Sequence, residues 1–386
     1  RPPRSTLSSS SAASDVYKRQ CQQTFLDNNL RGGWPFQLGE DHKKVIYHMY
    51  SRKHGDPERD YNAFYLASEF YSQGNGNYRD VCQNRRSEVW FAPFVRDTNI
   101  CNFTSLIQTD GYNPLTVKGS KFYLSSSKRG EFLEYTEQKN DLADLLEKVF
   151  TPGGLLKEIT DKNIHLAIPL ESFVNRVISN AHQYYDADFG EGYWTDHWIY
   201  ILDLITGYLS IFPEENDTLM FEKRALPFFE SPVFVQPRSK KYVLANGRAR
   251  QFGAVIHDKE KAKRIEERNV FPNYVRTNYG KGEIYRTNLF SKLLSLAVIK
   301  FSTLDPMGMG IEMEADKPSW CDALNGLPGL FGSSMAESFD LLRLLKFLQE
   351  TLLTGFVENL PIPVEISTLI SEVDSALMDY GKEKSE

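Results

Sequence analysis

The chain has 386 residues, of which 41% are hydrophobic and 25% charged, so it is long and apolar enough to fold around a sizeable core. Its 45 Lys and Arg against 51 Asp and Glu give a net charge of −6, which disfavours nucleic acid and anionic membranes as partners. No run of about 18 apolar residues occurs, so we expect no membrane span.

The ends and the cysteines bear on origin and compartment. Residues 1–20 are Ser-rich and lack the long apolar stretch of a secretory signal, so we interpret them as a non-native tail. Four cysteines, none in a C-x-x-C pair, favour a cytoplasmic protein without a disulfide framework or zinc site. We expect residues 21–386 to form one domain, an incomplete piece of a longer protein, with an insertion around 217–285.

A first polar segment, QGNGNYRDVCQNRR, runs from Gln73 to Arg86. After its Gly/Asn turn, the spacing of Asp80 and Gln83 places them one turn apart at the start of a helix, next to Arg79. Such a trio can hold neighbouring sugar hydroxyls. The alternative is a surface helix start at which the helix dipole stabilises Asp80.

Apolar periodicity predicts three amphipathic helices, over 138–150, 170–181 and 366–377, the last with Gly381 as its C-cap. Two further segments, 193–212 and 285–304, are apolar on most sides, which is typical of helices covered by other helices.

Two other stretches complete the secondary structure that we expect. Ser334 and Glu337 form an S-x-x-E capping box, which predicts a long helix ending near Leu353. Short β-like runs at 233–235, 242–244 and 254–256 are separated by Pro237, Asn246-Gly247 and Gly253, and they predict a small β excursion within a helical fold.

The second polar segment, GEGYWTDHWIY at 190–200, places Asp196 and His197 between Trp194 and Trp198. Aromatic rings beside carboxylates suit sugar binding, since rings stack on sugar faces while carboxylates hold hydroxyls. The alternative is that His197 is a helix-start histidine with a purely structural partner.

The third segment, at 307–335, is rich in Gly and Pro and carries Glu312, Glu314, Asp316, Trp320, Asp322 and Asn325. Cleavage of a glycosidic bond needs a carboxylic acid that protonates the leaving oxygen, and Asp322 in W-C-D-A-L-N has that chemistry. The alternative is that Asp322 caps a helix while Trp320 belongs to the core.

Three short motifs occur in the order Y-R-D-V-C-Q-N, W-T-D-H-W and S-W-C-D-A-L-N. They resemble the motifs Y/F-R-D-x-x-Q-D, N-D-D-x-x-W and D-W-N-D-x-x-N of the cellobiose and chitobiose phosphorylases, which form glycoside hydrolase family ninety-four. The resemblance implies an all-α (α/α)6 barrel, in agreement with the helical pattern. It also implies that Asp322 is the general acid and that the sugar site includes Arg79, Asp80, Gln83, Asp196, Trp320 and Asn325.

Two positions depart from the family pattern: Gly74 stands where the family has Arg, and Ser319 where it has Asp. The residues that bind phosphate in the family lie well beyond the acid, and no histidine of this chain lies beyond His257. Contacts to the donor sugar and to phosphate are therefore expected to differ from those of the family.

We therefore expect an enzyme that cleaves a disaccharide or oligosaccharide with inversion, using inorganic phosphate as co-substrate and no metal or other cofactor. An inverting hydrolase is the first alternative and needs a base, for which Glu312 and Glu314 are candidates, although we favour a structural role for both. A non-catalytic carbohydrate-binding module is the second alternative. The sugar, its linkage and the oligomeric state, with a homodimer among the options, stay open.

Overall fold

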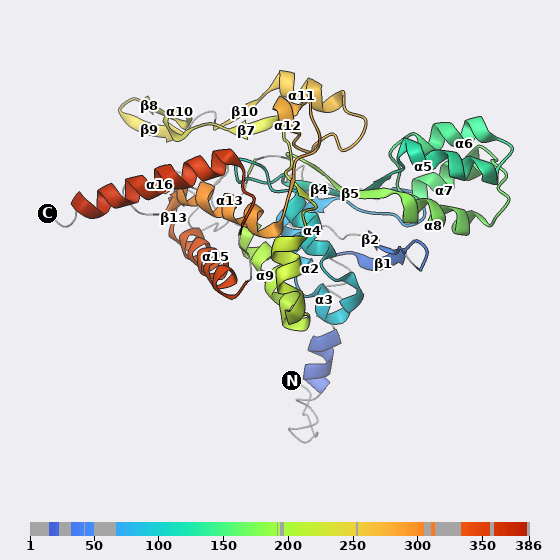
Figure 1. Cartoon of the computed structure of the whole chain (residues 1–386), viewed down its shortest axis with the longest axis horizontal. Coiled ribbons are helices and arrows are strands. Elements are labelled where there is room, and N and C mark those ends of the chain that lie inside the picture. Colours follow the sequence, from blue (N-terminus) through green and yellow to red (C-terminus); the bar gives the residue numbers. More distant parts are fainter. Residues whose placement is uncertain are drawn as a thin grey trace, which may run out of the picture.

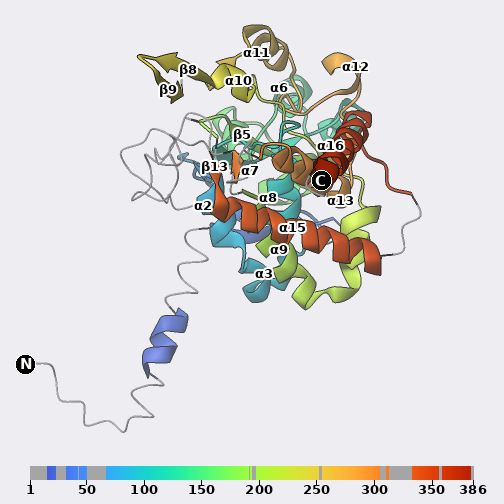
Figure 2. The same cartoon turned by 90° about the vertical axis from the view of Figure 1, so that its left-hand side faces the viewer.

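The computed structural model describes residues 15–22, 32–41, 43–49, 67–190, 192–193, 197–251, 254–304, 310–312, 333–355 and 359–383. Residues 15–22 form a short helix whose residues are all exposed, and Figure 2 shows it apart from the rest of the molecule.

The helices of the described part run in chain order as follows: α2 Tyr78–Arg85, α3 Glu88–Phe91, α4 Thr98–Ser105, α5 Ser126–Phe132, α6 Lys139–Leu146, α7 Pro152–Asp161, α8 Leu170–Asn180, α9 His197–Ile211, α10 Arg238–Lys241, α11 Lys259–Glu266, α12 Thr277–Gly280, α13 Leu289–Phe301, α15 Met335–Thr354 and α16 Val364–Glu383. Short 3₁₀ or π turns lie at η2 Pro93–Val95, η3 Leu133–Tyr135, η4 Pro213–Glu215 and η5 Thr218–Glu222.

The strands are β1 Trp34–Leu38, β2 Val45–Met49, β3 Gly76–Asn77, β4 Thr116–Tyr123, β5 His182–Asp188, β6 Leu226–Pro227, β7 Val233–Val235, β8 Tyr242–Ala245, β9 Arg248–Gln251, β10 Val255–His257, β11 Arg286–Thr287, β12 Ile311–Glu312 and β13 Ser333–Ser334. They form small antiparallel sheets, in the orders β1-β2, β3-β4-β5, β6-β11, β7-β10, β8-β9 and β12-β13.

The prediction of an all-α (α/α)6 barrel is wrong, because strands make up 17% of the structure and the sheet built on β4 and β5 is central to it. The sequence signal for these strands is weak. Lys, Ser and Gln interrupt their apolar residues, and a bulge shifts the register between Val117 and Gly119. Gly119 has φ +104°, and a Cβ there would lie 2.6 Å from the Oε1 atom of Gln73, so the bulge requires glycine.

The β4–β5 ribbon joins two separate hydrophobic cores (Figure 1). Val117 and Ala187 pack into the first core, which contains residues of α2, α4, α9, α13 and α15. Phe122, farther along β4, packs into the second core with residues of α5 to α8. Helices α5 to α8 accordingly lie at one end of the ribbon, at the right of Figure 1, and the larger helical body lies at the other.

Helices α9 and α13 form the centre of that larger body. Helix α9 contacts α2, α3, α4 and α15, and α13 contacts α15, α16 and η5. Figure 2 shows α15 lying across α9. The prediction that segments 193–212 and 285–304 are helices covered by other helices is confirmed.

The three predicted amphipathic helices are present as α6, α8 and α16, with two differences at their ends, and the predicted long helix is present as α15. Helix α6 ends at Leu146, because Phe150 instead pairs with Phe122 in an antiparallel β-bridge. The prediction that Gly381 is a C-cap is wrong, since α16 continues to Glu383. The side chain of Ser334 lies outside the described part, so the proposed capping box is not placed.

The predicted β excursion is confirmed in β7, β8 and β10, and it contains a further strand, β9. Asn246 and Gly247 join β8 to β9 with φ values of +54° and +72°, as a two-residue hairpin turn requires.

Candidate functional site

The first motif forms the start of α2. The Oδ1 atom of Asn77 accepts a hydrogen bond from the backbone N of Arg79 at 3.0 Å and thereby caps the helix. Arg79 and Asp80 are buried, at 3% and 8% exposure, and the Nε atom of Arg79 lies 3.5 Å from the Oδ1 atom of Asp80. Gln83 is exposed on the same helix. The structure therefore buries the Arg-Asp pair of the motif and leaves its amide at the surface.

The carboxyl group of Asp80 is buried, which is unusual for an aspartate at the start of a helix. Burial raises its pKa above the ordinary value, and the neighbouring Arg79 opposes that effect. Its Oδ2 atom is buried and accepts no hydrogen bond from the part of the chain that the structure describes. Leaving a buried acceptor oxygen of this kind unpaired costs free energy.

The second motif meets the first through α9. His197 opens this helix and is 1% exposed, and its ring stands perpendicular to that of Tyr78 with 6.4 Å between the centroids. Trp198 is equally buried, lies 5.3 Å from the ring of His197, and has an Nε1 atom without a hydrogen-bond partner among the described residues. Trp194 and Asp196 lie outside the described residues.

Of the third segment, residues 310–312 and 333–335 are described, and its motif at 319–325 lies outside the described residues. Glu312 lies on β12, is buried, and forms an ion pair with the buried Lys241 at the end of α10. This ion pair agrees with the structural role favoured for Glu312. Glu314, Trp320, Asp322 and Asn325 lie outside the described residues.

Lys300 was not identified from the sequence. It lies near Trp198 of the second motif and within electrostatic reach of Glu312 of the third segment. Its Nζ atom is 3.6 Å from the centre of the Tyr112 ring and 5.9 Å from that of Trp198. Burial lowers its pKa to about 7; the carboxylates of Asp110 and Glu312 oppose this effect, and Lys241 adds to it. A lysine inside the apolar segment 285–304 was the sequence signal that could have revealed it.

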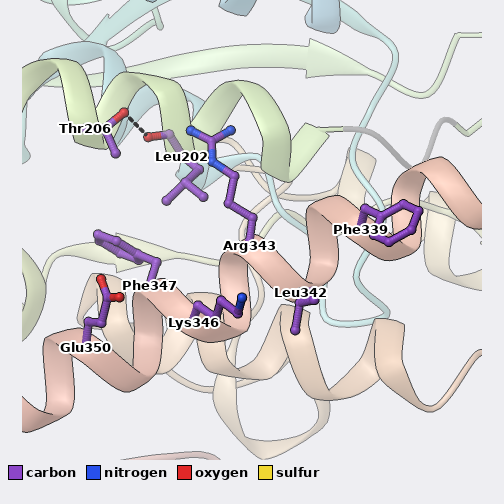
Figure 3. Close-up of a pocket in the computed structure, with 8 residues that line it drawn as sticks. All are labelled: Leu202, Thr206, Phe339, Leu342, Arg343, Lys346, Phe347 and Glu350. Atoms are coloured by element: carbon purple, nitrogen blue, oxygen red, sulfur yellow. Dashed lines mark hydrogen bonds between the residues drawn. The ribbon is translucent and has the colours of Figure 1, made fainter.

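A separate groove of about 420 Å³ lies between α9 and α15 (Figure 3). Its lining combines apolar side chains such as Leu202 and Phe347 with Arg343 and Lys346, and Arg343 donates a hydrogen bond to Asp203 at 3.0 Å. None of its lining residues belongs to the three motifs. The groove therefore lies outside the three motifs.

Comparison with known proteins identifies no family for this chain. No protein-family model and no curated protein matches the chain. Within the described ranges, no group of three or more His, Cys, Asp and Glu side chains could hold a metal ion. No helix in those ranges is long and apolar enough to cross a membrane.

Proposed function

We propose that this chain binds a disaccharide or oligosaccharide and cleaves its glycosidic bond with inversion, by phosphorolysis to a sugar 1-phosphate. The observation that carries the proposal is the convergence of three segments that are distant in sequence. Tyr78 of the first contacts His197 of the second, and Trp198 shares the neighbour Lys300 with Glu312 of the third. The proposal depends on these contacts and on the motif residues, and not on a barrel fold.

The described side chains support recognition of a polyhydroxyl ligand. Asp80 has a buried oxygen that accepts no hydrogen bond from the described residues, and Trp198 has an indole N–H that donates none to them. An acceptor and a donor next to buried aromatic rings are what a sugar needs, since rings cover its C–H faces while polar atoms bind its hydroxyls. Arg79 would hold the Asp80 carboxylate in place.

The chemistry that we propose has one protein acid. Asp322 protonates the leaving oxygen while inorganic phosphate attacks the anomeric carbon from the opposite face, so the bond to the leaving sugar breaks as the bond to phosphate forms. No catalytic base is needed, because phosphate is itself the nucleophile. The ion pair of Glu312 with Lys241 favours this reaction over hydrolysis with Glu312 as base, and it leaves Glu314 as the base of the alternative hydrolase.

The test is an assay of products over a panel of β-linked disaccharides, each with and without phosphate. We expect sugar 1-phosphate only when phosphate is present, and we expect Asp322→Asn to abolish turnover while sugar affinity changes little. Asp316→Asn, which removes a carboxylate from the same segment, is the matched control and should keep its activity.

The other outcomes of this assay distinguish the alternatives. Free sugar released without phosphate would show a hydrolase and direct attention to Glu314. Sugar binding without any turnover, unchanged by Asp322→Asn, would show a binding module. Binding should also weaken in Asp80→Asn and not in Asp144→Asn, which changes an exposed carboxylate on α6. Equal affinities in these two variants would remove Asp80 from the sugar site.

A further inference from the structure

The ammonium of Lys300 is surrounded by elements that carry the proposed sugar site. Lys300 lies in the last turn of α13, where the helix dipole favours a cation, and it is 1% exposed. The ring of Tyr112 covers the ammonium at 3.6 Å and Trp198 lies at 5.9 Å, so both rings can make cation–π contacts with it.

The same ammonium acts on Glu312 of the third segment. The Glu312 carboxylate lies within electrostatic reach of Lys300 and forms its ion pair with Lys241, so lysines from two different elements act on one carboxylate. The backbone at this point is fixed as well, since the N atom of Glu312 donates to the O atom of Thr303 at 2.9 Å. Loss of the charge on Lys300 therefore changes the surroundings of both Trp198 and Glu312.

We propose that Lys300 is a positioning residue of the sugar site: its ammonium holds the Trp198 ring and the Glu312 carboxylate in one arrangement, and sugar binding is strongest while Lys300 is charged. This inference rests on the proposed function. It adds to that function a dependence on pH which resides in a residue outside the three motifs.

Two physical arguments support this role. A buried ammonium costs stability, whereas a methionine of similar shape would not, and such costs are typical of residues kept for function. Burial also lowers the pKa of Lys300 to about 7, so the charge that the proposal requires changes in the neutral range.

The charged and titratable groups around this position determine how the test is designed. Asp110 and Glu312 attract the ammonium and Lys241 repels it, while the imidazole of His197 lies beside Trp198. A pH effect at Trp198 must therefore be assigned to Lys300 or to His197 by substitution.

The first measurement requires no sugar: the tryptophan emission of the full chain is titrated from pH 6 to pH 9. We expect a transition near pH 7 that is lost in Lys300→Met and in Trp198→Phe but persists in His197→Gln. Lys292→Met, which changes another fully buried lysine of α13, is the matched control and should keep the transition. A transition that survives in Lys300→Met, or that disappears in His197→Gln, would overturn the proposal.

The second measurement is the affinity for cellobiose at pH 6 and at pH 8.5. We expect the wild type and Lys292→Met to bind at least about fivefold more weakly at the higher pH, whereas Lys300→Met binds weakly at both. Lys300→Gln replaces the Met variant if that one does not fold. Wild-type affinity and pH dependence in a folded Lys300 variant would refute the positioning role. Absence of binding in every protein would count against the proposed function, and the emission titration would still decide whether Lys300 controls the state of Trp198.

Discussion

Substitution of Lys300 by methionine should change how the stability of the protein depends on pH. Methionine fills a similar volume but carries no charge, so the variant lacks the titration that burial imposes on Lys300. The quantity of interest is the difference in free energy of unfolding between the variant and the wild type, measured as a function of pH.

The direction and size of the effect follow from the shifted pKa. The unfolded chain binds the lysine proton more tightly than the folded protein does, so the wild type gains stability as the pH rises from about 7 towards the ordinary value of 10.5. The interval between the two pKa values corresponds to about 5 kcal/mol, of which about 3–4 kcal/mol is recovered between pH 7 and pH 10. The advantage of Lys300→Met over the wild type should therefore shrink by that amount across this range.

The assay is urea unfolding followed by circular dichroism at pH 7, 8, 9 and 10. Lys259→Met, which changes an exposed lysine in the first turn of α11, is the control and should follow the wild type at every pH. A difference between Lys300→Met and the wild type that stays constant with pH would refute the reasoning, because it would mean that Lys300 titrates alike in the folded and unfolded states.

Three further substitutions test other parts of the structure. Phe173→Ala removes a fully buried ring whose centroid lies 6.0 Å from that of Phe132. It should lower the free energy of unfolding by about 3–5 kcal/mol in guanidinium titrations. A loss below about 1 kcal/mol would contradict the packing of the second core. Burial lowers the pKa of His48, so the wild type should lose stability as the pH falls below 6.5. In thermal melts, the stability of His48→Gln should depend less on pH. The same pH dependence in both proteins would argue against a buried neutral imidazole. Asn288→Ala removes the cap of α13, in which Oδ1 of Asn288 accepts a hydrogen bond from the N atom of Ser291 at 2.8 Å. It should lower the free energy of unfolding by about 1–2 kcal/mol. Asn288→Ser should recover most of that loss in thermal melts.

The helices could be predicted from the sequence because their signal is local. Leu142, Leu145 and Leu146 recur with the period of a helix, and these residues face the second core in α6. The same argument places α8 and α16. It fails at helix ends, where Phe150 leaves the helical pattern to pair with Phe122, a residue that no local pattern connects to it.

Residues of the candidate site were selected from the sequence, but their arrangement was not predicted. Arg79, Asp80 and His197 were identified from residue type and spacing, and the structure buries all three where α2 meets α9. Lys300 was missed, because its setting depends on Tyr112 and Trp198, which contact it only through the fold.

The sequence by itself determined the helices with regular apolar periodicity, the turn at Asn246-Gly247, and the polar segments that we propose to bind sugar. Only the tertiary structure decided that β4 pairs with β5, that this ribbon joins two separate hydrophobic cores, and that the ammonium of Lys300 lies near Trp198. The physical reason is the range of the interactions. Helical periodicity and turn chemistry act over a few residues, whereas strand pairing, burial and charge interactions join residues that are distant along the chain.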